Sequence, residues 1–120
     1  LLSALAPNAM AFNGVPFQYK AHPIQVKTNE RVRVWVMDAG PNLATTFHVV
    51  GTQFDTVWRE GAYVIRGGGS GGGWSQVLSL GAAEGGFVEF TPLEAGHYAF
   101  VNHALSLAEK GQTGVFEVTD

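Results

Sequence analysis

His48 and His103 are the two residues of this chain whose chemistry is most informative. They lie in two separate strand-like segments, Thr45-Thr-Phe-His-Val-Val-Gly51 and Tyr98-Ala-Phe-Val-Asn-His103, and the sequence contains no cysteine. An imidazole can bind a transition metal or transfer protons near neutral pH, but two imidazoles are too few to hold such a metal alone. The pair therefore predicts part of a site whose other donors come from elsewhere.

Each histidine also has a purely structural explanation. His48 alternates with Phe47 and Val49, so if those two face the core, His48 points toward solvent or an interface. There it is either a hydrogen-bonded sheet histidine or a proton donor. His103 ends a strand at a loop, where scaffolds often present reactive side chains. The residues alone leave a metal ligand and a structural histidine open at that position.

The composition predicts one folded domain and limits its partners. The 120 residues are 46% hydrophobic and 14% charged, as in globular β-rich proteins. The formal charge of −3 gives no basic stripe, so we expect no nucleic-acid partner and favour a small anion or another protein.

A blue-copper centre within this chain is excluded because it needs a thiolate, and the sequence has no cysteine. No apolar run approaches the roughly 18 residues that span a bilayer, so we expect no membrane span.

Alternating apolar and polar residues, interrupted by turn residues, predict an all-β sandwich with antiparallel sheets. The stretch 31–37 alternates most clearly, with valines on one face and Arg31, Arg33 and Trp35 on the other. One short loop helix is expected at 104–110, ended by Gly111. The expected strands are 9–13, 22–27, 31–37, 45–50, 53–58, 75–80, 86–91, 97–102 and 114–118.

The remaining polar and glycine-rich segments are expected to form exposed loops and turns rather than a catalytic or binding site. The glycine-rich stretch 67–73 lacks the Lys-Ser/Thr of a phosphate-binding loop and predicts a mobile surface loop. His22 and His97 are expected to be solvated. Asp55, with the Arg59-Glu60 pair that follows it, predicts a charged turn. The sequence shows no carboxylate pair or ordered catalytic triad that would support a hydrolase.

Seven segments occur in an order that resembles one family. They are Phe12-Asn-Gly14, Arg31-Val-Arg-Val-Trp-Val36, Gly40-Pro-Asn-Leu-Ala-Thr-Thr-Phe-His-Val-Val-Gly51, Phe54-Asp-Thr-Val57, Gly86-Phe-Val-Glu-Phe90, Gly96-His-Tyr-Ala-Phe-Val-Asn-His103 and Lys110-Gly-Gln-Thr-Gly-Val-Phe116. Together they look like the second, C-terminal cupredoxin domain of copper-containing nitrite reductases and related two-domain multicopper oxidases. The resemblance implies a cupredoxin-like Greek-key β-sandwich at 11–120, preceded at 1–10 by a linker from another domain.

The resemblance also implies a shared metal site. In that family a subunit has two cupredoxin domains, and three subunits form a ring with a type 2 copper at each interface. The match implies that His103 is a copper ligand, that His48 is the catalytic histidine, and that Val50 is an aliphatic residue packed over the substrate. The implied reaction is one-electron reduction of nitrite to nitric oxide.

The implied partners are a preceding domain that holds type 1 copper, two further subunits of a homotrimer, and a small anion such as nitrite. An extracytoplasmic location is expected because the family is exported. We expect no copper to be tightly bound to the isolated domain, which should be inactive alone.

The chain departs from the family in one strand, and two alternatives remain. The family often has a Glu-Thr pair that orients the catalytic histidine, which Ser75 and Gln76 do not reproduce. One alternative is a laccase-like multicopper oxidase domain in which His103 helps to hold a multi-copper cluster. The other is a copper-free structural or assembly module that keeps the cupredoxin sandwich, since a fold does not guarantee a function.

Overall fold

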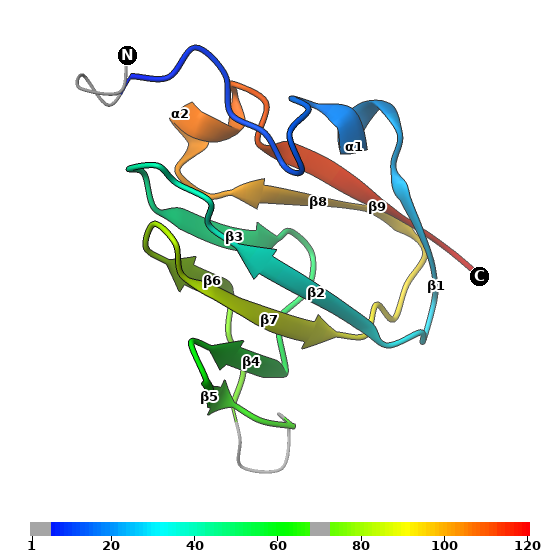
Figure 1. The fold of residues 1–120 in the computed structure, drawn as a ribbon. Helices are drawn as coiled ribbons and strands as arrows, with labels where there is room; N and C mark the ends of the chain where they lie inside the picture. The colour runs from blue at the N-terminus through cyan, green and yellow to red at the C-terminus, as the bar shows by residue number, and fades with distance from the viewer. Residues whose placement is uncertain (1–5, 68–72) are drawn as a thin grey trace.

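The chain folds into two β-sheets that pack face to face (Figure 1). The structure is a computed structural model that describes residues 6–67 and 73–120. One sheet has five strands in the order β1-β9-β8-β3-β6, and the other has four in the order β2-β7-β4-β5. The strands are β1 (Ile24–Lys27), β2 (Val32–Met37), β3 (Thr45–Val49), β4 (Thr56–Arg59), β5 (Ala62–Ile65), β6 (Val77–Leu80), β7 (Gly85–Phe90), β8 (Gly96–Asn102) and β9 (Thr113–Thr119). The predicted all-β sandwich is confirmed, but the expectation of antiparallel sheets is wrong for one pair, because β1 pairs with β9 in parallel.

Alternation along the strands fills the space between the sheets. In β3, Phe47 and Val49 are 2% and 0% exposed, while His48 lies on the opposite face, as the sequence predicted. The Phe47 ring stacks on Phe54, with centroids 6.2 Å apart. Phe100 joins the same cluster, with its ring centroid 6.0 Å from that of Phe47. This aromatic core forms the rigid support behind β3.

The alternation predicted for β2 is also confirmed. Its valines are partly buried and pack against the core, whereas Arg33, Trp35 and Met37 are exposed. Residues of opposite faces thus separate within one strand, as the pleat requires. The outer face of the four-stranded sheet is consequently aromatic and basic.

The residues predicted as a charged turn are held by ion pairs. Arg31 donates two hydrogen bonds to the Asp55 carboxylate, at 2.8 and 2.6 Å. This contact raises the pKa of Arg31 and lowers the pKa of Asp55. Arg59 donates similarly to Glu84 at 2.9 and 3.0 Å. The charged groups therefore connect neighbouring segments of this sheet.

The prediction of a strand at 9–13 is wrong. In this region Phe12 forms an isolated bridge with Val15, across a turn at Asn13 and Gly14 with positive φ angles. The backbone N–H of Met10 instead donates to the Lys110 carbonyl at 3.1 Å. This segment is held by the loop before β9 rather than by a sheet.

Strand β5 was not predicted, and β4 lies later than expected. Glu60 and Gly61 both have positive φ, which makes a tight two-residue hairpin turn between the two strands. The stretch expected at 53–58 begins as a strand only at Thr56, since Phe54 makes just an isolated bridge to Ser75. The hairpin was missed because its turn, Glu60-Gly61, has the composition of an ordinary charged loop.

Within residues 6–67 and 73–120, two helices of four residues each occur in place of the single one predicted. Helix α2 (Leu105–Ala108) lies within the expected range, whereas α1 (Gln18–Ala21) was not predicted. Helix α1 is too short to show a periodic pattern, and Phe17 at its N-cap provides no side-chain hydrogen bond. Both helices lie beside the five-stranded sheet (Figure 1). Among the described residues, no helix is long and apolar enough to cross a membrane.

Most of the glycine-rich stretch predicted to be a mobile loop, residues 68–72, lies outside the described residues.

Candidate functional site

Strand pairing brings His48 and His103 together. Strands β3 and β8 are antiparallel, with His48 opposite Val101 and Phe47 opposite Asn102. His103 follows β8 directly, and its backbone N–H donates to the Thr46 carbonyl at 2.8 Å. The two imidazole centroids are consequently 5.3 Å apart, with their planes at 69°. The two residues singled out in the sequence are therefore neighbours on one surface.

The pair lies on the outer face of the five-stranded sheet. His48 is half-buried and His103 is exposed. Val77 and Val101 are the cross-strand neighbours of His48, so they lie beside it on the same face. Val50 follows two residues after His48 and is 49% exposed. His48 therefore has valine side chains beside it, and electrostatic interactions at this face would be strengthened if another surface covered it.

A backbone carbonyl orients His48. Its Nδ1 lies 2.5 Å from the Gln76 carbonyl oxygen. A carbonyl can only accept a hydrogen bond, so Nδ1 carries the proton and donates it. Nε2 is then the nitrogen that can take up or release a proton. The strand that lacks the Glu-Thr pair of the family still orients this ring, because the contact uses the main chain.

Gln76 and Asn102 are site residues that the sequence reasoning missed. The contribution of Gln76 comes from its backbone, which residue identity does not reveal. Asn102 is 0% exposed and lies directly before His103, with its side chain pointing into the protein. An amide in the middle of the Phe-Val-Asn-His run was the available signal, because a buried amide in a strand needs partners.

The two imidazoles alone are too few donors to hold a transition metal. Within residues 6–67 and 73–120, no group of three or more His, Cys, Asp or Glu side chains is arranged to hold a metal ion. The pair can supply imidazole nitrogens, which suit copper, but fewer than a copper site needs. Any copper at this face would therefore need further ligands besides these two imidazoles.

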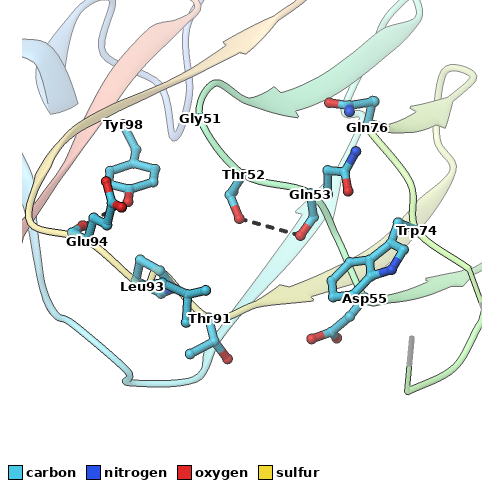
Figure 2. Close-up of a pocket in the computed structure, with 11 residues that line it drawn as sticks. Gly51, Thr52, Gln53, Asp55, Trp74, Gln76, Thr91, Leu93, Glu94 and Tyr98 are labelled. Carbon is cyan, nitrogen blue, oxygen red and sulfur yellow. Dashed lines mark hydrogen bonds between the residues drawn. The ribbon is translucent and has the colours of Figure 1, made fainter. Parts of the chain in front are cut away.

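Figure 2 shows an open groove of about 720 Å³, and Gln76 is one of the residues that line it. Gln53, Trp74 and Gln76 are on one side, and Leu93, Glu94 and Tyr98 are on the other. The Gln76 side chain lines this groove while its carbonyl holds His48. Neither histidine lines it, so the groove does not contain the imidazole pair.

The other two histidines are exposed, as predicted, and belong to other places. His22 follows α1, and His97 lies at the start of β8, opposite Glu117 of β9. His97 lies near the start of β8, whereas His103 follows the end of that strand; by alternation the two point to the same face of the sheet.

The chain matches known copper proteins over nearly its whole length. It matches the family model described as "Multicopper oxidase" over residues 1–120. It is 34% identical to a copper-containing nitrite reductase of Neisseria meningitidis over 116 residues, which are 93% of this chain and 28% of that relative. The chain therefore spans little more than a quarter of the curated relative that it matches.

Solved structures agree with this relationship. A copper-containing nitrite reductase from Thermus scotoductus superposes with a TM-score of 0.82 at 29% identity, covering 92% of this chain and 25% of the other. A copper nitrite reductase from Nitrosomonas europaea gives a TM-score of 0.80 at 25% identity, covering 94% of this chain and 40% of the other. The chain belongs to the multicopper oxidase family and is a cupredoxin domain of the type found in its nitrite reductases and oxidases.

Proposed function

We propose that this domain contributes His103 as a ligand, and His48 as an acid/base residue, to a type 2 copper shared with another domain or subunit. The complete site would reduce nitrite to nitric oxide. The observation that carries this proposal is the 5.3 Å separation of the two imidazoles on an open face. The similarity to a copper-containing nitrite reductase supports the choice of substrate.

Copper would bind the anion and deliver one electron to it. Reduction of nitrite to nitric oxide and water also consumes two protons. His48 supplies one of them from Nε2, because its Nδ1–H is held by the Gln76 carbonyl. The second proton comes from solvent. The chemistry of this chain is therefore proton delivery and metal binding by two neighbouring rings.

Val50 forms an aliphatic wall beside the reacting anion. It is on the same face as His48, and its backbone N–H donates to the Ala99 carbonyl at 2.7 Å, which fixes its position. Val50 and Val101 offer the anion no hydrogen bonds, so its orientation is left to the metal and His48. We assign Val50 to the substrate pocket on this basis.

A neighbouring polypeptide completes the site in this proposal. The partners are a preceding domain with type 1 copper and two further subunits of a homotrimer, in an extracytoplasmic location. Exposed imidazoles next to valine side chains are suited to burial against another protein that supplies further ligands. Because the chain spans 28% of its curated relative, the remaining ligands can come from polypeptide outside these residues.

The test is His103→Ala in the assembled copper protein. We expect loss of the type 2 copper and a fall in nitrite reduction of about 100-fold or more, because a metal ligand is removed. Metal analysis and the copper signals in electron paramagnetic resonance measure the occupancy. His97→Ala is the matched control, since His97 is also exposed and points to the same face of the five-stranded sheet.

Three results would contradict the proposal. If the His103→Ala variant keeps stoichiometric type 2 copper, His103 is not a copper ligand. Loss of several coppers per subunit would indicate a laccase-like cluster instead. A wild-type protein that binds no copper at this face would indicate a structural module.

A further inference from the structure

His103 lies just beyond the regular part of the sheet. The last ladder pair between β3 and β8 is Phe47 with Asn102, and the chain then turns toward α2 through Ala104. One backbone bond, from the His103 N–H to the Thr46 carbonyl, continues the pairing. Sheet hydrogen bonding alone therefore leaves the orientation of His103 weakly determined.

The Asn102 side chain adds the missing restraint. Its Oδ1 accepts hydrogen bonds from the Thr46 N–H at 3.2 Å, the Thr46 hydroxyl at 3.1 Å and the Ala104 N–H at 3.2 Å. Thr46 is two residues before His48, and Ala104 is the residue after His103. One oxygen atom thus joins the backbone segments that carry the two imidazoles.

The other end of the amide is anchored in the interior. Asn102 Nδ2 donates to Gln112 Oε1 at 2.7 Å and to the Ala44 carbonyl at 3.5 Å. Gln112 is 8% exposed, and its Nε2 in turn donates to the Ala11 carbonyl at 3.4 Å. Both ends of the Asn102 amide are satisfied, and a fully satisfied buried network is rigid.

We propose that Asn102 is a positioning residue that sets the separation of His48 and His103. This inference rests on the proposed function for its catalytic meaning, but the geometry that it predicts exists without copper. The position needs an acceptor toward Thr46 and Ala104 and a donor toward Gln112, which an amide side chain supplies together. Leucine has the same branched side-chain shape but supplies neither group.

The primary test compares Asn102→Leu with Gln112→Leu in the metal-free chain. Amide hydrogen exchange is measured at His103 and Ala104 relative to core amides such as Val49 and Val88. In Asn102→Leu we expect exchange at the two loop amides to rise about ten-fold more than in the core, because their local restraint is lost. In Gln112→Leu, which leaves the Oδ1 contacts in place, all amides should respond alike.

The conservative variant Asn102→Asp should rescue the site. In its protonated form it keeps one oxygen toward Thr46 and Ala104 and has an O–H that can donate to Gln112. In the assembled copper protein, Asn102→Leu should weaken copper binding by about 10- to 100-fold and alter the type 2 signal, as loss of an outer hydrogen bond does. Asn102→Asp should retain the wild-type signal.

Uniform exchange in both leucine variants, with an unchanged copper signal, would overturn the positioning role and leave Asn102 a general stability residue. If Asn102→Leu does not fold, Thr46→Val removes one Oδ1 contact and should shift the same loop amides in the same direction. No shift there would equally overturn the role. If the loop amides respond while His103→Ala keeps its copper, the positioning role stands and the proposed function fails.

Discussion

The outer faces of the two sheets differ in how their polar groups find partners. On the four-stranded sheet, the Arg33 guanidinium lies 4.3 Å from the centre of the Phe87 ring, and its Nε lies 3.4 Å from Glu89 Oε2. On the five-stranded sheet, His48 hydrogen-bonds to one backbone carbonyl. The His103 ring makes no hydrogen bond within the part of the chain that the structure describes.

This difference supports our proposal that the chemistry lies on the histidine face and not on the arginine face. The arginines of the four-stranded sheet are compensated by carboxylates and rings of the same chain, so that face needs no further group for its charges. The imidazoles retain donor and acceptor capacity that the described chain does not use. Incomplete coordination, rather than a large aromatic patch, therefore marks the face where we expect the chemistry.

Among the substitutions that test this comparison, His48→Gln should have the largest effect, a loss of catalytic rate. A glutamine amide can still donate to the Gln76 carbonyl, but it cannot transfer a proton. We expect kcat for nitrite reduction to fall by about 100- to 10,000-fold while the type 2 copper remains. Steady-state kinetics and metal analysis of the assembled protein measure both quantities. A kcat within a few-fold of wild type, matching a His97→Gln control, would show that His48 carries no proton.

Truncating Phe47, which packs behind the histidine face, should lower the free energy of unfolding. Phe47→Ala leaves a cavity among the core rings, because Phe47 is 2% exposed. We expect the free energy of unfolding to fall by about 3 to 5 kcal/mol in urea titrations. Trp35→Ala on the other sheet is the control, since that side chain is 64% exposed and should cost far less. Equal losses would contradict the assignment of these residues to core and surface.

Val50→Ala should have a smaller effect, confined to the substrate. Val50 is 49% exposed, so its truncation should leave stability within about 0.5 kcal/mol of wild type. We expect KM for nitrite to change by less than about ten-fold, with the copper retained. Substrate kinetics against the matched variant Val64→Ala, on the four-stranded sheet, measure the difference. A kcat loss as large as that of His48→Gln would contradict the proposal that Val50 only shapes the substrate pocket.

The smallest effect belongs to the opposite face and depends on pH. The hydrogen bonds from Arg31 lower the pKa of Asp55 in the folded protein. The ion pair therefore contributes stability above the ordinary carboxyl pKa of about 3.9, and this contribution is lost as the pH falls through the lowered value. Because the Arg31 side chain is 45% exposed, we expect Asp55→Asn to cost about 1 kcal/mol or less at neutral pH.

Urea unfolding of Asp55→Asn and wild type across the acid range checks this sign. The two stabilities should converge as the pH falls, while the control Glu94→Gln, at an exposed position, runs parallel to wild type. A difference between Asp55→Asn and wild type that stays constant from neutral to strongly acid pH would contradict the role of this ion pair.

Local patterns in the sequence were enough to predict which side chains face outward. Alternation placed His48 opposite Phe47 and Val49, and placed Arg33 and Trp35 on the outside of β2. These predictions depend on the two-residue period of a strand, which acts within a few residues. The hairpin that forms β5 was missed because its turn, Glu60-Gly61, also has the composition of an ordinary charged loop.

The proximity of His48 and His103 could not be derived from spacing. It depends on the register of β3 against β8, which tertiary packing sets over a long separation in the sequence. The resemblance to a family suggested the shared site, but not the contacts that hold it. The Gln76 carbonyl acts through the backbone, and the Asn102 network links segments that are distant in the sequence, so neither leaves a local motif.

The parallel pairing of β1 with β9 has a consequence for biosynthesis. Ile24 lies opposite Phe116 and Val26 opposite Val118. Strand β1, near the start of the chain, can therefore pair only after β9, near its end, has been made. Pairings of such high contact order slow folding, and on the ribosome β1 stays without its neighbour until residues 113–119 have emerged. Premature termination before Thr113 would leave strand edges open to aggregation. The domain should therefore acquire its native sheet after translation of the final strand rather than during elongation.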